Sequence, residues 1–226
     1  MPAMEQPVSI PIGPIAVSGD LAVPDNARGI VIFAHGTGSS RHSPRNRFVA
    51  QVLQQSGLAT LLMDLLTPQE ESFDSATGEL RFNVQLLAAR LVAATEWLAG
   101  CSATRSLEPG YFGASTGAAA ALVAAARLPG RIGAIVSRGG RPDLAGAALQ
   151  QVRAPTLLIV GGNDGPVIAL NEAARNQLRI ESRLEIIPGA GHLFEEPGAL
   201  EQVASLARNW FSEHLGLNRA QEEAAV

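Results

Sequence analysis

Short runs of consecutive apolar residues recur along the chain and alternate with segments of helical periodicity. The runs cover residues 29–35, 59–63, 110–114, 132–136, 155–160 and 183–187. Continuous apolar runs of this length are typical of strands that are buried on both faces of a parallel sheet. Apolar residues at helical spacing cover 47–56, 80–98, 116–128, 144–152, 167–178 and 197–215. This alternation predicts βαβ units, and therefore an α/β protein with a mostly parallel sheet and helices on both faces.

Two regions depart from the alternation. In residues 8–23, short apolar stretches are broken by Pro11, Gly13 and Gly19, a pattern that predicts an antiparallel hairpin at the N-terminus. Residues 217–226 are polar and are expected to form a loose tail. The chain has 226 residues, 46% of them hydrophobic, and no long linker, so we expect a single domain over residues 1–216. The connection at 137–143 carries no insertion that would form a large lid, so the site should be open.

Composition and charge restrict the partners and the compartment. A formal net charge of −4 provides no basic field that would attract nucleic acid or an anionic membrane. The single cysteine, Cys101, excludes an internal disulfide and a multi-cysteine zinc site, and we expect it to pack at a helix end. The first residues lack the basic and apolar regions of a signal peptide, and no apolar run reaches the length of a membrane span. We therefore expect a cytoplasmic protein.

The clearest chemical signal is the pentapeptide Gly-Ala-Ser-Thr-Gly at residues 113–117. It directly follows a predicted strand and directly precedes a predicted helix, which is the setting where a strained turn holds a serine hydroxyl above the sheet. Glycines suit such a turn because its close packing leaves no space for side chains. The alternative is a simple tight turn with a helix-capping serine. The context favours Ser115 as a nucleophile.

A serine hydroxyl is a poor nucleophile until a base removes its proton. Of the four histidines, His192 lies in the Gly-Ala-Gly-His segment just after the last predicted strand, and it is the best candidate for the base. His35 ends the first core strand and is expected to brace the glycine loop next to it. His214 lies on the last amphipathic helix and is expected to be a surface residue.

The imidazole in turn needs a carboxylate that fixes its tautomer and stabilises the imidazolium. Asp164 closes the segment Gly-Gly-Asn-Asp directly after the strand at 155–160. It completes the chain order nucleophile, acid, base, with each group at the carboxyl end of a strand. Asp143 and Asp64 also come after predicted strands and remain alternatives.

The tetrahedral intermediate of acyl transfer needs two N–H donors for its oxyanion. The first expected donor is the backbone of Thr116, the residue after the nucleophile. The second is expected from the glycine loop after the first core strand, where Thr37 comes directly after His35-Gly36 and Gly38 is the alternative donor.

The glycine-containing segments at 35–40, 113–117, 161–164 and 189–192 together resemble the dienelactone hydrolase-like branch of the α/β-hydrolases. The resemblance extends from the N-terminal hairpin to the last helix. It is closest to the hydrolase half of bacterial proteins in which such a domain is joined to a phosphoribosyltransferase, and segments 41–47, 137–143 and 192–198 look typical of that subgroup. The resemblance implies an α/β-hydrolase fold without a large lid.

Two features depart from the family pattern. Dienelactone hydrolases proper have a cysteine nucleophile, whereas this chain has Ser115, which favours ester hydrolysis over the specific lactone reaction. The phosphoribosyltransferase half is absent from this sequence, so the resemblance implies nothing about that reaction.

Arginines gather in two loops that should open on the catalytic face, because βα loops emerge at the carboxyl ends of the strands. Guanidinium groups there can pair with a carboxylate or phosphate on a substrate. We mark Arg41, Arg138 and Arg141 as candidate substrate-binding residues; Arg45 and Arg47 lie beside the first. The alternative is that these arginines form salt bridges with acidic residues of the chain, namely Asp64, Glu70, Glu71, Glu195 and Glu196.

The sequence therefore predicts a serine carboxylesterase that acts on small ester substrates through an acyl-enzyme at Ser115, with His192 as base and Asp164 behind it. One alternative is a lactone or thioester hydrolase or an acyltransferase with the same residues. Another is a binding module for a small acid in which the triad is a relic. No dinucleotide, P-loop or metal-ligand motif is present, so we expect no cofactor and no metal. The sequence leaves the oligomeric state open, a homodimer included.

Overall fold

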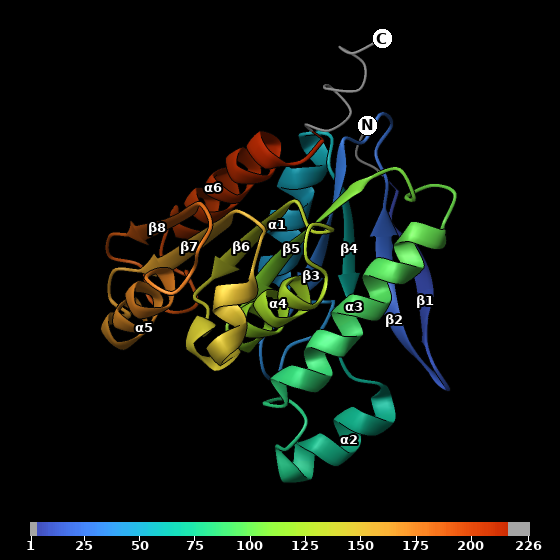
Figure 1. The fold of residues 1–226 in the computed structure, drawn as a ribbon, viewed down its shortest axis with the longest axis horizontal. Coiled ribbons are helices and arrows are strands. Elements are labelled where there is room, and N and C mark those ends of the chain that lie inside the picture. Colours follow the sequence, from blue (N-terminus) through green and yellow to red (C-terminus); the bar gives the residue numbers. More distant parts are fainter. Residues whose placement is uncertain (1–3, 217–226) are drawn as a thin grey trace.

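The computed structural model describes residues 4–216 and contains an eight-stranded sheet with the order β1-β2-β4-β3-β5-β6-β7-β8 (Figure 1). The strands are β1 (Gln6–Ile12), β2 (Ile15–Ala22), β3 (Gly29–Ala34), β4 (Ala59–Met63), β5 (Glu108–Ala114), β6 (Ala134–Arg138), β7 (Thr156–Gly161) and β8 (Ser182–Ile187). β2 pairs antiparallel with both β1 and β4, and the strands from β4 to β8 pair in parallel. The predicted fold class, a mostly parallel sheet with an N-terminal antiparallel hairpin, is confirmed.

The inner strands explain why the apolar runs are visible in the sequence. β3, β4, β6 and β7 are buried at every position, because helices cover both faces of the sheet. β8 lies at the edge of the sheet and buries only Ile187. Its shorter and weaker apolar pattern results from that position.

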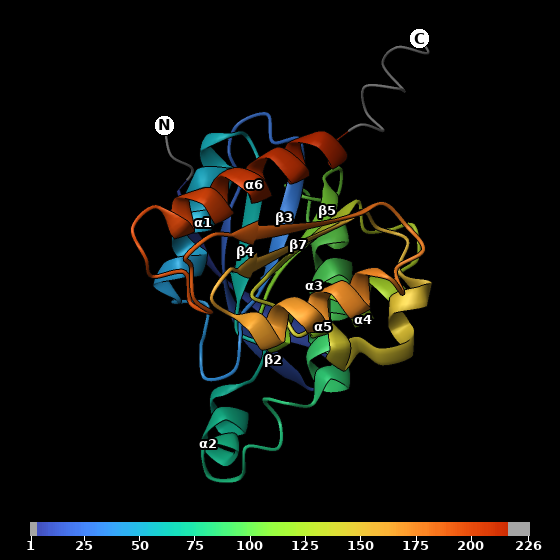
Figure 2. The same ribbon diagram turned by 90° about the vertical axis from the view of Figure 1, so that its left-hand side faces the viewer.

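Two helical layers sandwich the sheet (Figure 2). One layer is formed by α1 (Pro44–Gln55) and α6 (Ala199–His214), whose core side chains pack around Phe33 and Phe112 with ring centroids 5.0 Å apart. The other layer contains α3 (Val84–Gly100), α4 (Thr116–Arg127), α5 (Gly165–Arg175) and the 3-10 segment η1 (Pro142–Gln151). Residues 118–125 of α4 are buried, and their small side chains let this helix pack closely on the centre of the sheet.

The helix α2 (Pro68–Thr77) was not predicted from the periodicity of the sequence. Its only buried residue is Asp74, so it has no apolar stripe to detect. It is instead set by local signals: a capping box between Thr67 and Glu70 at its start, and Gly78 in a left-handed conformation at its end. The helix projects from the carboxyl edge of the sheet (Figure 1). The ion pair Glu70–Arg90 joins it to α3, and Asp74 pairs with Arg81 in the connection between the two helices.

The helical segment predicted at 144–152 corresponds to the 3-10 segment η1. Gly146 has φ 53° and interrupts the helical conformation inside it. Apolar spacing alone does not reveal such an interruption. The tail predicted at 217–226 lies outside the described residues. Within residues 4–216, none of the helices has the length and apolar character that crossing a bilayer requires.

Candidate active site

Ser115 lies between the end of β5 and the start of α4, at a sharp backbone turn. Its φ of 50° and ψ of −121° are rare for a residue with a side chain and cost free energy. Hydrogen bonds hold the turn in place: the Ser115 N–H donates to Arg138 O (3.2 Å), and the Ser115 carbonyl accepts from Ala118 N (3.1 Å) and Arg141 N (3.1 Å). The strain is therefore fixed by β6 and α4, which is the arrangement expected of a nucleophile turn.

The two glycines around Ser115 are required by close backbone packing. A Cβ at Gly113 would lie 2.7 Å from Ala118 N, and a Cβ at Gly117 would lie 2.5 Å from His35 O. Real Cβ atoms do not approach backbone atoms so closely. The pentapeptide thus brings β3, β5 and α4 together at one point.

His192 and Asp164 are in direct contact. His192 Nδ1 lies 2.6 Å from Asp164 Oδ2, and the two side chains come from the loop after β8 and from the residue preceding α5. Two hydrogen bonds connect the loops that carry these side chains: Asn163 N donates to Ala190 O (2.9 Å), and Asn163 Nδ2 donates to Gly189 O (2.7 Å). This contact fixes Nδ1–H toward the carboxylate, which leaves Nε2 as the nitrogen that can accept a proton.

The two alternative carboxylates, those of Asp64 and Asp143, are paired with arginines. Asp64 accepts hydrogen bonds from the backbone and guanidinium of Arg41, and Asp143 forms a bidentate pair with Arg141 at 2.8 and 2.8 Å. Of the three candidate aspartates, the structure brings Asp164 to His192.

Ser115 and His192 line the same cavity of about 200 Å³, which we call the Ser115 cavity. Among the described residues, Ser115 Oγ and His192 Nε2 do not form a hydrogen bond. Such bonds are often long in enzymes without substrate and tighten in the reacting complex. The shared cavity is therefore the observation that relates the two groups.

The two predicted oxyanion residues are in direct contact, and Thr37 lines the Ser115 cavity. Thr37 Oγ1 and Thr116 Oγ1 are hydrogen-bonded at 2.9 Å, although they are 79 positions apart in the chain. Gly36 packs against the nucleophile, since a Cβ there would lie 3.2 Å from Ser115 Cβ. Gly38, the alternative donor, has φ 68° and shapes the same loop. The N-terminus of α4 adds its free backbone N–H groups beside Ser115.

The imidazole of His35 contacts the glycine loop after β3 and the neighbouring loop after β4. It is 8% exposed, its Nε2 accepts a hydrogen bond from Leu65 N (3.1 Å), and its Nδ1 lies 3.0 Å from Gly36 O. The ring thus connects the loop after β3 to the loop after β4. Burial lowers the pKa of His35 below its ordinary value, and the Gly36 carbonyl and the charges of Asp64 and Glu71 only partly oppose this effect.

This burial predicts a pH dependence of stability. Because the folded-state pKa of His35 is lowered, the unfolded chain takes up a proton first as the pH falls below about 6.5, and the free energy of unfolding decreases there. We expect His35→Gln to flatten this decrease, by at most about 1.4 kcal/mol per pH unit. Urea unfolding between pH 7 and pH 5 measures it. His42→Gln, a change at an exposed histidine, is the control, and an equal effect of both substitutions would contradict the prediction.

The candidate substrate-binding arginines differ in their partners. Arg41 pairs with Asp64 and lies 3.6 Å from Asp20, and Arg141 pairs with Asp143. These two guanidinium groups are therefore engaged within the chain. Arg138, by contrast, is 8% exposed and lines the Ser115 cavity.

The other arginines after the glycine loop of β3 also pair with acidic groups. Arg45 lines the Ser115 cavity and pairs with Glu195 at 3.1 Å. Arg47 pairs with Glu5 and with Asp20. The predicted alternative of salt bridges thus describes most of the cluster, with partly different acidic partners.

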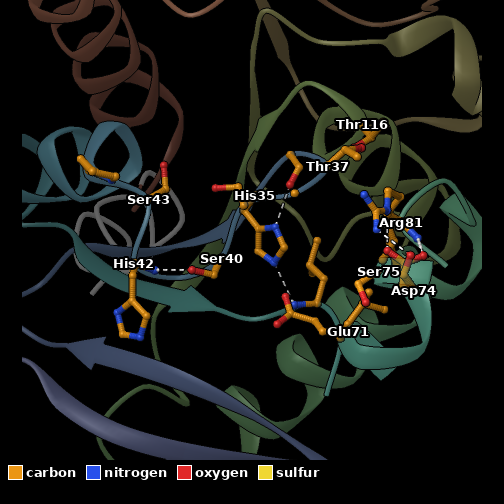
Figure 3. Close-up of a pocket in the computed structure, with 17 residues that line it drawn as sticks. His35, Thr37, Ser40, His42, Ser43, Glu71, Asp74, Ser75, Arg81 and Thr116 are labelled. Carbon is orange, nitrogen blue, oxygen red and sulfur yellow. Dashed lines mark hydrogen bonds and ion pairs between the residues drawn. The ribbon is translucent and has the colours of Figure 1, made fainter. Parts of the chain in front are cut away.

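A second cavity of about 550 Å³ adjoins the first at the glycine loop, and we call it the α2 cavity (Figure 3). It is lined by His35, Leu65, Leu66, Glu71, Arg81 and Thr116, among others, while Gly36 and Thr37 line both cavities. In Figure 3, His42 and Ser43 lie at one end of the cavity and Asp74, Ser75 and Arg81 at the other. The contribution of α2 was missed from the sequence; the capping box at Thr67–Glu70 was the available signal.

In residues 4–216, no group of three or more His, Cys, Asp or Glu side chains is placed to hold a metal ion. The fold, the strained serine after a central strand, and the histidine–aspartate pair on later loops define an α/β-hydrolase.

Comparison with known proteins agrees with this class. The model of the dienelactone hydrolase family matches residues 17–216. The crystal structure of a dienelactone hydrolase from Anabaena variabilis is 60% identical, with a TM-score of 0.94, and covers 95% of this chain and 100% of its own. The chain belongs to the dienelactone hydrolase family.

Two further proteins are similar to this chain, one in sequence and one in fold. A Mycobacterium tuberculosis protein named "Putative phosphoribosyl transferase" is 56% identical over 214 residues, which are 95% of this chain and 47% of that protein. The chain thus spans about half the length of the curated relatives it matches. Est1E from Butyrivibrio proteoclasticus is 16% identical with a TM-score of 0.76, covers 92% of this chain and 98% of its own, and shares the fold.

Proposed function

We propose that this protein hydrolyses carboxylic esters of small substrates through a covalent acyl-enzyme on Ser115. The observation that carries the proposal is the strained Ser115 in one cavity with His192, whose other ring nitrogen is hydrogen-bonded to Asp164. A hydroxyl, an imidazole and a carboxylate in this order supply a nucleophile, a base and an orienting charge.

Acylation begins when Ser115 Oγ attacks the ester carbonyl carbon and its proton passes to His192 Nε2. Asp164 stabilises the imidazolium that forms, and it keeps the ring in the tautomer that accepts at Nε2. The carbonyl oxygen becomes an oxyanion, which the backbone N–H groups of Thr37 and Thr116 stabilise. Collapse of the intermediate breaks the bond to the alcohol oxygen, and His192 returns its proton to that oxygen.

Deacylation repeats the steps with water. His192 removes a proton from water as the water oxygen attacks the acyl carbon, the same N–H groups hold the second oxyanion, and Ser115 leaves with the proton from His192. The acid product departs and the free enzyme is restored. Lactones and thioesters would react by the same path with a different leaving atom.

A fluorophosphonate probe tests the nucleophile directly. Attack of Ser115 Oγ on phosphorus expels fluoride, and we expect one stable adduct per chain on the peptide that carries Ser115, detected by mass spectrometry. Ser115→Ala should carry no adduct. Absence of the adduct from the folded wild-type protein, or an adduct of equal yield in Ser115→Ala, would reject the proposal in favour of a binding module.

A further inference from the structure

Arg138 is a buried cation beside the nucleophile, and no acidic side chain of residues 4–216 pairs with it. Within residues 4–216, its Nε and Nη1 atoms are enclosed and have no hydrogen-bond acceptor. Guanidinium N–H groups that lose water and gain no acceptor destabilise the folded protein. A buried arginine of this kind indicates that an acceptor from outside the chain completes it.

The surroundings of Arg138 support an external acceptor. Arg45 lines the same cavity, and its Nε is also enclosed without an acceptor in the described part of the chain. Burial, and secondarily the charge of Arg45, lower the pKa of Arg138 to about 10, so the group stays protonated at neutral pH. Arg45 pairs with Glu195, whose side chain is 66% exposed, whereas Arg138 forms no ion pair with the residues that the structure describes. The interior of the cavity therefore has a positive charge that the described residues do not neutralise.

Asn46 adds a third unsatisfied group. It is 1% exposed, it lines the Ser115 cavity, and its Oδ1 has no donor among the residues described. Beside two guanidinium groups, this amide oxygen can accept a hydrogen bond from a hydroxyl of a negatively charged ligand. Three polar side chains from β6 and the start of α1 thus converge on one small space.

The position of His192 indicates which part of the ester substrate occupies the Ser115 cavity. The base must return its proton to the leaving oxygen, so the leaving group has to lie against His192. His192 lines the Ser115 cavity but not the α2 cavity, which Thr37 and Thr116 line. The leaving group therefore occupies about 200 Å³, and the acyl group has the space of about 550 Å³.

We propose that Arg138, with Arg45, binds a carboxylate or phosphate on the leaving group, so that the preferred substrates are esters of small anionic alcohols or acyl phosphates. This inference rests on the proposed function and adds a substrate class to it. Collapse of the tetrahedral intermediate breaks the bond to the leaving oxygen, His192 protonates that oxygen, and the released hydroxy acid or phosphate keeps its charge against Arg138. The acyl group remains on Ser115 until water removes it.

Paired substrates separate this from a general attraction to anions. Butyryl glycolate and butyryl glycolamide differ in one carboxylate on the leaving alcohol, whereas methyl hemisuccinate and methyl succinamate differ in one carboxylate on the acyl side. We expect wild-type kcat/KM to favour butyryl glycolate by about 10- to 100-fold, without such a preference in the succinate pair. Butyryl phosphate, assayed by release of inorganic phosphate, tests the phosphate arm.

Arg138→Met should reduce the glycolate preference, measured as the ratio of kcat/KM for the two butyryl esters, to within about twofold. Its thermal midpoint should equal or exceed that of wild type, because an unpaired buried charge has been removed. Arg141→Met, at an arginine paired with Asp143, should keep the preference. A purely structural role for Arg138 predicts a lower midpoint with the preference retained.

The outcomes separate the two proposals. Turnover of the glycolamide ester that needs Ser115, without a preference for the glycolate ester, overturns the leaving-group assignment and leaves the esterase proposal intact. A preference that survives Arg138→Met also overturns it. If neither ester is cleaved and no fluorophosphonate adduct forms, the proposed function fails and this inference fails with it.

A binding measurement gives a readout without catalysis. Glycolate and inorganic phosphate at millimolar concentration should raise the thermal midpoint of Ser115→Ala, and should not raise that of Ser115→Ala/Arg138→Met. Equal shifts in both proteins would contradict a site at Arg138.

Discussion

Replacing Ser115 with alanine is expected to lower kcat for 4-nitrophenyl acetate by about four to six orders of magnitude, because the oxygen that carries the acyl group is removed. The residual rate should reflect the oxyanion donors and substrate positioning alone. Fold and stability should be retained, since alanine keeps the Cβ and the hydroxyl contributes no hydrogen bond to the start of α4. Release of nitrophenolate under single-turnover and steady-state conditions measures the effect.

A matched serine provides the control. Ser137 is fully buried on β6, beside Gly113 in the sheet register, and its Oγ has no partner among the described residues. Ser137→Ala makes the same chemical change one strand away and should keep kcat within about twofold. If Ser115→Ala retains more than about a tenth of the wild-type rate, or if both variants lose activity equally, the acyl-enzyme mechanism is wrong.

The strands could be predicted from the sequence because burial on both faces leaves an unambiguous pattern. The run at 59–63 coincides with β4, every residue of which is buried. The same logic could not find α2, whose residues are mostly solvated and whose position depends on a capping box and on ion pairs with Arg81 and Arg90. Periodicity detects elements that bury an apolar face; it does not detect those that are held by polar contacts.

The residues of the candidate site also differ in whether a local sequence pattern reveals their role. Ser115 could be singled out because its turn requires glycines at fixed positions, and these glycines form a recognisable local sequence pattern. From the sequence, Asp164 could be preferred to Asp64 and Asp143 only because it fits the chain order nucleophile, acid, base. The structure adds that Asp64 and Asp143 form ion pairs with arginines. Pairing of that kind depends on which distant loops meet at the sheet edge, so no local pattern encodes it.

The three candidate arginines differ in the fold in a way that the sequence does not show. Arg41, Arg138 and Arg141 are equivalent in the sequence, since each lies in a loop after a predicted strand. In the fold, two are neutralised by carboxylates and the third is enclosed beside the nucleophile without an acceptor among the residues described. The difference arises from acidic residues on neighbouring elements, and it separates the candidates only once the loops are placed together.

Gly117→Ala is expected to destabilise the protein by about 3 kcal/mol or more, at the upper end of what overpacking costs. The added Cβ would overlap the carbonyl oxygen of Ala34 and lie 2.5 Å from that of His35. Both are backbone atoms at the end of β3 and cannot rotate away, so β3 and α4 must separate. For a chain of this size the thermal midpoint should fall by roughly 6–12 °C. Differential scanning calorimetry measures it.

The same separation should also lower activity, because the loop after β3 carries Thr37 and α4 carries Thr116, and their spacing sets the oxyanion site. Gly100→Ala is the control: this glycine ends α3, a Cβ there meets nothing within 4 Å, and alanine suits a helix better. That variant should stay within about 0.5 kcal/mol of wild type and keep its activity. A Gly117→Ala protein with wild-type midpoint and kcat would show that β3 and α4 do not meet as closely as the nucleophile turn requires, and the placement of Ser115 would fall with it.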